Sequence, residues 1–410
     1  DRWKRAGGSY MSRLEELIQQ LCPDGVEYKS LQECTQKIDN IKWACANKDY
    51  QYIDLSSVDL DTHQISNTQI ISADNAPSRA QQIVRHNDIL LGTTRPMLRR
   101  YCMISSSYDG QICSTGFCVL RAQDFVLPQW IYHQITSTDF FAYVEKNQKG
   151  ASYPSISDTK VKEYQIPVPP LPVQQEIVRI LDSFTELTAE LTAELTARKK
   201  QYEYYRDELL TQCNASKVEL RQVVKKSCSG ATPAKGHSEY YENGTIPWLR
   251  TQDVRFNEIY EIDSYITEEA VKKTAAKWIP ENCVIVAISG ASAGRCAINK
   301  IKTTTNQHCL NMEIDGSKAL YKYVYYCVAS QYQELLSKKQ GARGDLNSSL
   351  ILGLQIPLPP LKEQRRIVSI LDRFDTLCND LTSGLPAEIE ARKKQYEYYR
   401  DKLLSFKVKT

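Results

Sequence analysis

The sequence lacks the features that would place it in a membrane or hold it together through disulfides or zinc. No run approaches the roughly 18 consecutive apolar residues that a membrane-spanning helix needs, and we expect no signal peptide. The 13 cysteines are scattered and form no CxxC pair. This distribution argues against a disulfide framework or a zinc motif, and it favours a reducing, cytoplasmic environment.

Motifs for nucleotide binding and catalysis are also missing. There is no GxxxxGK[ST] loop, and no GxGxxG follows a predicted strand. The nearest Gly/Ser-rich stretch is SGASAGR at 289–295, which lacks the glycine spacing and the lysine of a phosphate-binding loop. His308 lies beside Cys309, but no second pair of ligands supports a metal site. We therefore expect no catalytic residue, metal or cofactor on this chain.

The charge balance gives little guidance about partners. The net charge is +3. Residues 26–163 contain 14 basic and 15 acidic side chains, and residues 218–353 contain 17 and 14. These values neither require nor exclude a nucleic acid partner, so any surface that binds phosphates must be a local patch.

What the sequence does contain is one stretch that occurs twice. ARKKQYEYYRD runs from 197 to 207 and returns unchanged at 391–401. YQIPVPPLPVQQEIVRILDSF at 164–184 reappears as LQIPLPPLKEQRRIVSILDRF at 354–374. The offset of about 190 residues is too long for a solenoid or propeller repeat. A domain-sized unit has therefore been duplicated, and a helical segment closes each copy.

Two segments of the chain have the mixed pattern of globular domains. Residues 11–163 combine an amphipathic helix at 11–22 with short strands (QYIDL, DILLG and GFCVL) and one helix at 130–144. Residues 218–353 are predicted to contain strands at 246–254, 283–289 and 308–314 and a helix at 322–336. Residues 1–10 precede Met11, and we interpret them as a remnant of expression. The fold class is therefore mixed α/β (α+β), with two similar globules.

Helical regions at 164–217 and 354–410 follow the two globules. Each begins with a proline strip, which favours an extended backbone. The helix predicted at 173–213 is about 60 Å long. Alternating steps of four and three residues along this helix define ten positions, and eight of them are apolar or aromatic. The ten positions are Ile177, Leu181, Phe184, Thr188, Leu191, Leu195, Arg198, Tyr202, Tyr205 and Leu209. This is a heptad seam that needs a partner, because so long a helix is not stable alone.

The second helix keeps this register from Ile367 to Leu381. SGLP at 383–386 interrupts it, so we expect a break and a restart at Pro386. The opening segment 13–31 resembles 206–224, so the N-terminal helix can supply a piece that the C-terminal copy lacks. We therefore expect a pseudo-two-fold, circular arrangement, in which two long antiparallel, coiled-coil-like helices separate the globules and the chain ends lie close together.

These motifs resemble one known family. The IPxPPL strips, the EQxRI-like helix starts and the RKKQYEYYRDxLL ends are similar to those of the specificity (S) subunits of type I restriction–modification systems. The resemblance covers the chain after Met11. IPWLRTQDV at 246–254, TNQHC at 305–309 and GASYPSIS at 150–157 resemble parts of that family's target-recognition domains, and GARGDLNSS at 341–349 is a weaker counterpart of the last. The first globule lacks an IPW motif.

The resemblance implies a DNA-recognition subunit without catalysis of its own. Each target-recognition domain would read one half of a split site in double-stranded DNA. The helices would fix the gap between the halves and dock two methyltransferase (M) subunits, which restriction (R) subunits would join. S-adenosylmethionine, ATP and Mg would be bound by those partner subunits. The alternatives are a helical adaptor that binds proteins and no DNA, and an enzyme with a diverged active site.

Candidate DNA contacts follow from residue chemistry, because phosphates attract Lys and Arg and base edges pair with Arg, Asn, Gln, Ser or Thr. In the first globule the candidates are Arg95, Arg99, Arg100, Lys146, Lys149, Ser152 and Tyr153. In the second they are Arg250, Thr251, Gln252, Ser289, Ser292, Arg295, Asn306, Gln307, His308, Lys338, Lys339 and Arg343. A solvated loop or a plain turn is the alternative for each group. We expect Trp248 in the core.

The repeated tyrosines divide into two sets. Tyr202, Tyr205, Tyr396 and Tyr399 lie on the seam, so we expect them to pack between helices. Tyr204 and Tyr398 lie off the seam, where an exposed aromatic ring beside arginine suits a partner subunit.

Overall fold

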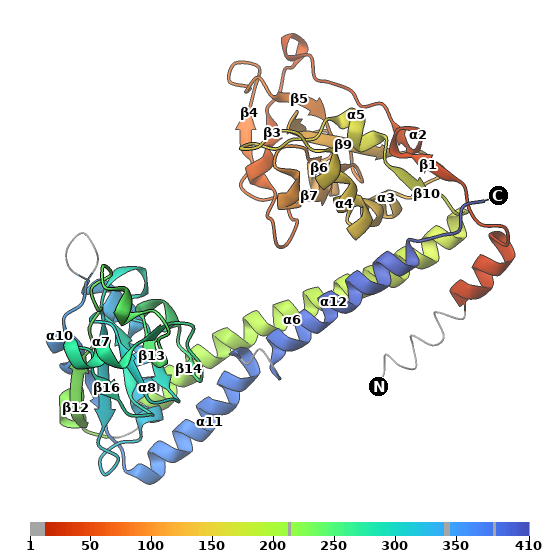
Figure 1. The fold of residues 1–410 in the computed structure, drawn as a ribbon. Coiled ribbons are helices and arrows are strands. Elements are labelled where there is room, and N and C mark those ends of the chain that lie inside the picture. The colour runs from red at the N-terminus through yellow and green to blue at the C-terminus, as the bar shows by residue number, and fades with distance from the viewer. Residues whose placement is uncertain (1–12, 212–214, 340–344, 380–382, 410) are drawn as a thin grey trace. The chain divides into compact units, whose positions relative to one another are not determined.

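The computed structural model describes residues 13–211, 215–339, 345–379 and 383–409 (Figure 1). The chain divides into unit 1, Asp1–Leu191 with Ile389–Thr410, and unit 2, Thr192–Glu388. Each unit thus contains one globule and helical segments from both copies of the repeat. Residues 1–10 and the candidate Arg343 lie outside the described residues. Among the described helices, none combines the length and the apolar character needed to traverse a lipid bilayer.

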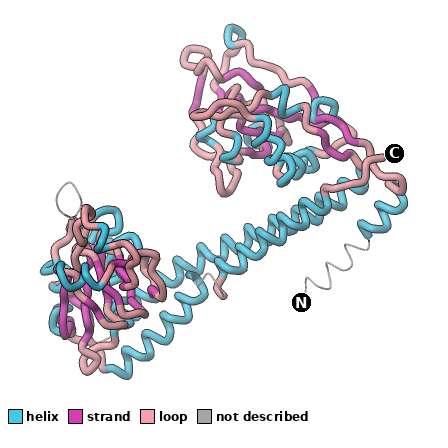
Figure 2. Tube along the Cα trace, in the orientation of Figure 1, coloured by secondary structure: helices cyan, strands magenta, loops and turns pink. Residues whose placement is uncertain are grey.

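Unit 1 contains two four-stranded sheets, and α-helices pack on the first of them (Figure 2). The first has the order β2-β9-β6-β7 (Thr35–Gln36, Phe117–Ala122, Ile89–Gly92, Tyr101–Met103), and the second has the order β4-β3-β8-β5 (Gln69–Ile71, Tyr50–Ile53, Ile112–Ser114, Ala80–Ile83). The short helical elements are α2 (Leu31–Cys34), η1 (Trp43–Cys45), η2 (Leu55–Ser57), η3 (Pro96–Leu98), η4 (Ser106–Tyr108) and α5 (Asp158–Lys162). The predicted strands DILLG and GFCVL are confirmed as β6 and β9, which pair antiparallel.

The single helix predicted at 130–144 is wrong, because this segment forms two helices. They are α3 (Pro128–Ile135) and α4 (Thr138–Asn147). The Thr136 hydroxyl donates to the carbonyl of His133 at 3.0 Å, and the Ser137 hydroxyl accepts from the Phe140 amide at 3.2 Å. Ser and Thr side chains compete with the helix backbone in this way, and Ser137 caps the start of α4.

Unit 2 repeats this plan. One sheet has the order β12-β20-β17-β18-β14 (Val224–Ser229, Cys309–Ile314, Val284–Ala287, Cys296–Asn299, Glu258–Ile259), and the other has the order β15-β13-β19-β16 (Tyr265–Ile266, Ile246–Leu249, Thr303–Thr305, Trp278–Ile279). The helical elements are η5 (Leu220–Gln222), η6 (Ser238–Tyr240), η7 (Thr251–Asp253), α7 (Glu268–Lys273), η8 (Gly290–Ser292), α8 (Tyr321–Ser330), α9 (Tyr332–Ser337) and α10 (Ser348–Leu352). The strand predicted to reach Val254 ends at Leu249, because the Asp253 carboxylate accepts from the Arg250 amide at 2.8 Å and closes a turn.

The first globule matches the second without an IPW motif. β3 pairs parallel with β8, as β13 pairs parallel with β19. Trp248 in β13 is buried, as predicted, and its indole donates to the carbonyl of Ala231 at 3.1 Å. The missing motif therefore does not change the strand arrangement.

Each proline strip begins with a short strand that anchors it to its globule. β1 (Tyr28–Ser30) pairs with β10 (Gln165–Pro167), and β11 (Lys217–Glu219) pairs with β21 (Gln355–Pro357). In unit 1 the Trp130 indole donates to the carbonyl of Pro167 at 2.9 Å, and in unit 2 the Tyr323 hydroxyl donates to that of Pro357 at 2.9 Å. Tyr28 therefore corresponds to Lys217.

A buried glutamine joins each strip to the helix that follows it. Gln174 accepts from the Leu127 amide at 2.9 Å and donates to the carbonyl of Pro169 at 2.7 Å. Gln364 makes the same two bonds in unit 2, with the Leu320 amide at 2.8 Å and the carbonyl of Pro359 at 2.8 Å. Both side chains are fully buried. Each helix therefore starts at a fixed point of its globule.

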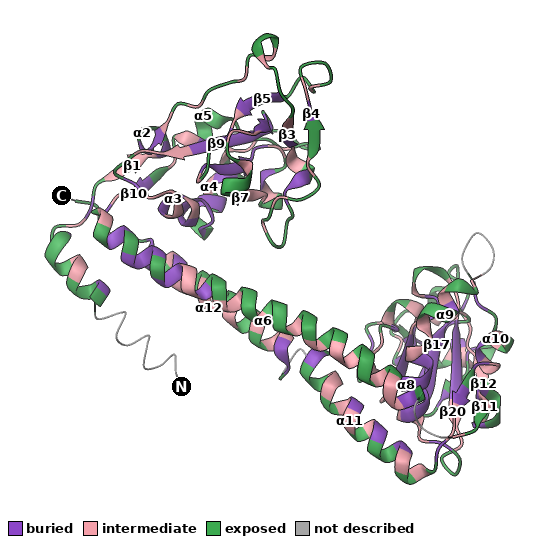
Figure 3. Ribbon diagram, turned by 180° about the vertical axis from the view of Figure 1, so that it is seen from behind, coloured by how far each residue is buried: buried purple, intermediate pink, exposed green. Residues whose placement is uncertain are grey.

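The long helix α6 runs without interruption over Leu171–Thr211. In unit 1 its first half packs against α12 (Leu385–Leu403), which runs in the opposite direction (Figure 1). In unit 2 its second half faces α11 (Leu361–Asn379), where the rings of Tyr202 and Phe374 lie 6.4 Å apart. The buried residues of α6 lie near its start, between Val173 and Phe184, and at Leu210 near its end (Figure 3). The break in the second helix is confirmed, since Pro386 lies in the first turn of α12.

The two ends of the described chain meet in unit 1. The amide of Val26 donates to the carbonyl of Lys407 at 2.9 Å, and the amide of Lys409 donates to that of Val26 at 2.9 Å. Residues 13–21 are helical, and Leu14 is buried in the same core cluster as Leu403 and Leu404. The prediction that the two ends lie close together is confirmed.

Candidate nucleic-acid interface

The loop between β6 and β7 carries the first group of predicted DNA contacts. It contains the short turn η3 between two arginines, Arg95 and Arg99, whose φ angles are 49° and 53°. Both side chains are exposed. The amide of Gly92 donates to the carbonyl of Arg100 at 2.7 Å and closes the loop at its base.

Lys149, Ser152 and Tyr153, which were also predicted as DNA contacts, lie in a tight hairpin beside this loop. Lys149 and Ser155 exchange two backbone hydrogen bonds of 2.8 Å around the turn. Gly150 has a φ of 100°, and a Cβ there would lie 3.0 Å from the carbonyl oxygen of Tyr153, so the turn requires glycine. The Arg95 amide donates to the carbonyl of Pro154 at 2.7 Å. The structure therefore brings the two predicted groups of unit 1 together.

The three arginines of the loop differ in their contacts. The Arg95 guanidinium carbon lies 4.5 Å from the centre of the Tyr153 ring, and that of Arg99 lies 4.7 Å from the centre of the Phe141 ring. Arg100 is half-buried and donates to the backbone carbonyl oxygens of Leu55 and Val58. Arg100 thus holds the loop to η2, which leaves Arg95 and Arg99 to face solvent.

Other predicted residues of unit 1 extend the same surface. Lys146 lies in the last turn of α4, and Ser152 lies in the turn of the hairpin; both are exposed, and Tyr153 is 70% exposed. Phe141 was not among the predicted residues. It is buried and was hidden in an apolar helix pattern, so its contact with Arg99 had no signal in the sequence.

In unit 2 three predicted loops also meet at one edge of the sheets. The amide of Asn306 donates to the carbonyl of Leu249 at 3.0 Å, which joins the 306–308 loop to the 250–252 turn. The amide of Ile288 donates to the carbonyl of His308 at 2.8 Å, which joins the same loop to the segment 289–295. Loops remote in sequence therefore form one surface.

The predicted residues of this surface are not equally accessible. Gln252 and Gln307 are exposed, whereas Arg250, Thr251, Ser289, Ser292, Arg295 and His308 are half-buried. Asn306 is buried, and its carboxamide oxygen accepts from the His308 amide at 3.1 Å, so it holds its loop in shape. The sequence missed Thr232, whose hydroxyl donates to the Gln307 side chain. Gly230, two residues earlier, marks a close approach of this segment to Thr305, because a Cβ at Gly230 would clash with the Thr305 carbonyl.

Lys338 and Lys339 directly follow α9, which ends at Ser337. Lys338 forms an ion pair with Glu334 on its own helix. Within the part of the chain that is described, no hydrogen bond or ion pair connects either lysine to the other predicted contacts. The geometry does not join these two residues to the loop surface of unit 2.

Comparison with known proteins bears directly on this duplicated architecture. The family model of the type I restriction modification DNA specificity domain matches the chain twice, over residues 23–198 and 214–391. The chain belongs to this family. Each match contains one globule, its proline strip and a long helical segment, so the repeat found in the sequence is a repeat of the specificity domain.

Individual relatives agree with the family. The chain is 43% identical over 264 residues to the type I restriction enzyme EcoR124I/EcoR124II specificity subunit of Escherichia coli, a match that covers 61% of this chain and 65% of that one. It is 34% identical over 307 residues to a putative type I restriction enzyme specificity subunit of Haemophilus influenzae, covering 70% and 74%. The chain thus spans about two thirds of the length of the first of these relatives.

Solved structures show the same fold. The HsdS subunit from Thermoanaerobacter tengcongensis is 24% identical, with a TM-score of 0.50, and the match covers 94% of this chain and 97% of that one. A chain from a study of complex assembly and conformational transition of the type I R-M system has a TM-score of 0.69 at 24% identity, over 94% and 98% of the two chains.

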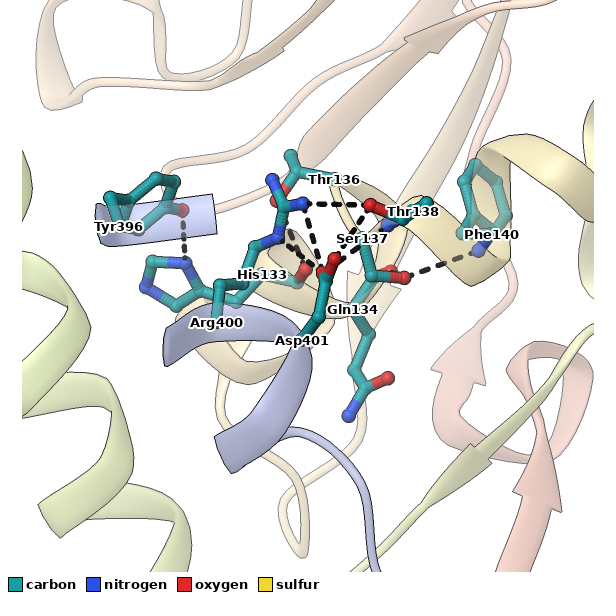
Figure 4. A network of polar contacts seen from close by, with 9 residues as sticks. All are labelled: His133, Gln134, Thr136, Ser137, Thr138, Phe140, Tyr396, Arg400 and Asp401. Atoms are coloured by element: carbon teal, nitrogen blue, oxygen red, sulfur yellow. Dashed lines mark hydrogen bonds and ion pairs between the residues drawn. The ribbon is translucent and has the colours of Figure 1, made fainter. Parts of the chain in front are cut away.

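In unit 1, the end of α12 is held against the junction of α3 and α4 (Figure 4). The Thr138 hydroxyl donates to the Asp401 carboxylate at 2.6 Å, and Arg400 donates to the same carboxylate at 2.9 Å. The Tyr396 hydroxyl and the His133 ring lie within 3.1 Å. The repeated motif QYEYYRD therefore fixes a specificity domain to a helix of the other copy.

The twin motif in unit 2 borders an open cavity. Asp207, the twin of Asp401, pairs with Arg206 at 2.8 Å and lines a cavity of about 520 Å³ together with Tyr202 and Tyr325. Nearby, the Tyr326 hydroxyl donates to the Asp372 carboxylate at 2.6 Å. The two halves share their plan but differ in how tightly the helix end closes on the globule.

Proposed function

We propose that this chain is the DNA sequence-specificity subunit of a type I restriction–modification complex. Each specificity domain reads one half of a bipartite site in double-stranded DNA. The observation that supports this most directly is the surface of unit 1, where the exposed Arg95, Arg99, Lys146 and Lys149 gather from two loops and a helix end. Such a local cluster of cations suits phosphate and base-edge contacts on one face of a duplex.

We propose that the helices set the spacer between the half-sites and dock two methyltransferase subunits. The off-seam rings Tyr204 and Tyr398 are each 63% exposed, and exposed aromatic rings are enriched in protein interfaces. Restriction subunits join that complex. Methyl transfer and cleavage occur on the partners, which bind S-adenosylmethionine, ATP and Mg, so this chain is not itself an enzyme.

A methylome tests the proposal. The chain is expressed with a methyltransferase subunit of its own system in a host that lacks this modification, and methylated bases are mapped by long-read sequencing. A split motif with a fixed gap is expected. A soluble complex that adds no methylation to the genome contradicts DNA readout, and it favours the alternative function of a helical adaptor that binds proteins through the exposed tyrosines.

A further inference from the structure

Arg95 and Tyr153 form a pair that the protein core does not require. Arg99 lies over Phe141, whose ring is 2% exposed, so that arginine covers the core. Arg100 is bound by two backbone carbonyls. The guanidinium of Arg95 instead lies over the ring of Tyr153, which is 70% exposed. Of the three arginines in the loop, Arg95 therefore has the contact that contributes least to packing.

The backbone at Arg95 is also unusual. Its φ of 49° lies in the left-handed region, which residues other than Gly, Asn and Asp rarely adopt. The hydrogen bond from its amide to Pro154, in the hairpin that carries Tyr153, holds the residue there. Strained conformations that the surroundings enforce occur preferentially at functional sites. The loop and the hairpin together fix the place from which this side chain leaves the surface.

Resting against a ring leaves a guanidinium well suited to read a base. The ring contacts one face of the planar group, so the N–H donors at its edge stay free to point outward. No hydrogen bond or ion pair engages the Arg95 side chain within the described residues. A pre-oriented guanidinium fork matches O6 and N7 of guanine in the major groove, where it forms two parallel hydrogen bonds.

We propose that Arg95, held over the Tyr153 ring, reads a guanine in the half-site bound by the first specificity domain. This inference rests on the proposed function, because it assumes that the surface contacts DNA. The second domain has a different loop at this place. The Ala287 amide donates to the Arg295 carbonyl and closes that loop, as the Gly92 amide does with the Arg100 carbonyl in the first domain. Residues 288–294, between these two ends, contain no arginine. Guanine reading from this loop therefore belongs to the first domain alone.

The test is a selection from randomised duplexes with the full chain bound to its methyltransferase subunits. Arg95→Gly removes the side chain and suits the left-handed backbone. We expect it to reduce discrimination at a single G·C pair by about 10- to 100-fold and to leave the rest of the motif unchanged. Arg95→Lys keeps the charge but loses the planar fork, so it should lose part of the same discrimination while the salt dependence of binding stays the same.

Two further variants serve as controls. Tyr153→Phe keeps the ring and should preserve discrimination, whereas Tyr153→Ser should weaken it at the same base pair. Arg99→Ala should lower affinity for all sequences alike. Melting curves of each complex check that the variants are folded.

Three outcomes would overturn the inference. One is a wild-type motif that Arg95→Gly leaves unchanged, and another is a uniform loss of affinity in that variant, which would make Arg95 a phosphate contact. Both leave the proposed function standing. The third is a wild-type complex that selects no motif, which overturns the proposed function together with this inference.

Discussion

The rings of Phe184 and Tyr399 stack with their centres 5.5 Å apart and their planes 23° apart. Phe184 belongs to the first copy of the repeat and Tyr399 to the second. Their counterparts, Phe374 and Tyr205, stack in unit 2 at 5.9 Å and 28°. Each unit is therefore closed by a phenylalanine of one copy and a tyrosine of the other, so the two copies stabilise each other through the same contact.

This pairing predicts the effect of Phe184→Ala. Phe184 is 3% exposed, so its truncation should destabilise unit 1 by about 3–5 kcal/mol. Phe374 is only half-buried, and Phe374→Ala should cost unit 2 less. Hydrogen exchange measured by mass spectrometry reports each unit separately. Faster exchange in unit 2 after Phe184→Ala, with unit 1 unchanged, would contradict the assignment.

The buried glutamines give a second, matched pair of variants. Gln174→Ala leaves the amide of Leu127 and the carbonyl of Pro169 without their partner beside a fully buried side-chain position. We expect a loss of about 1–3 kcal/mol, seen as faster exchange around the first proline strip. Gln364→Ala should do the same around the second strip only. Equal effects on both strips from either variant would show that the two anchors do not act independently.

The carboxyl group of Asp375 predicts a stability that depends on pH. Burial raises the pKa of Asp375, and the nearby Asp372 and Glu258 add to the rise. Between the ordinary carboxyl pKa of about 4 and the raised pKa of the folded state, the folded chain binds more protons than the unfolded one, so stability falls as pH increases through this window. Asp375→Asn should raise the melting temperature at pH 7.5, and this gain should disappear below about pH 4.

Asp372→Asn is the control for that measurement. Asp372 accepts from Tyr326 and pairs with Lys322 at 3.0 Å, so its ionised form has partners. Its replacement should destabilise unit 2 at neutral pH. A loss of stability in both variants would mean that the Asp375 carboxylate is stabilising in the folded chain.

The repeat, the proline strips and most of the seam could be predicted from the sequence because each is a local pattern, although Tyr205, expected on the seam, is 39% exposed. Eleven identical residues mark the duplication directly. The roles of Arg95 and Arg100 could not be told apart, because they depend on partners far along the chain, Tyr153 and Leu55. Asn306 was predicted as a DNA contact on its side-chain chemistry, yet the fold buries it. The backbone preference and the side-chain chemistry of a residue can be inferred from its type, whereas contacts with distant parts of the chain decide how exposed it is.

The TAEL repeats in α6 provide the sharpest test of a ruler. Residues 185–197 lie inside an unbroken helix, so deletion of Thr188–Leu191 removes one complete unit and leaves the repeat pattern intact. The helix becomes shorter by about 6 Å. Because DNA rises about 3.4 Å per base pair, the gap between the half-sites should shrink by about one to two base pairs.

Both half-sites should stay the same in that variant, since neither recognition surface is altered. The exposed Ala189 offers the control: Ala189→Gln changes the same stretch without changing its length, so the gap should remain that of the wild type. The methylome of each variant gives the motif directly. A shorter α6 with an unchanged gap would mean that the helix does not set the spacing, whereas an altered half-site would mean that the deletion disturbs a specificity domain as well.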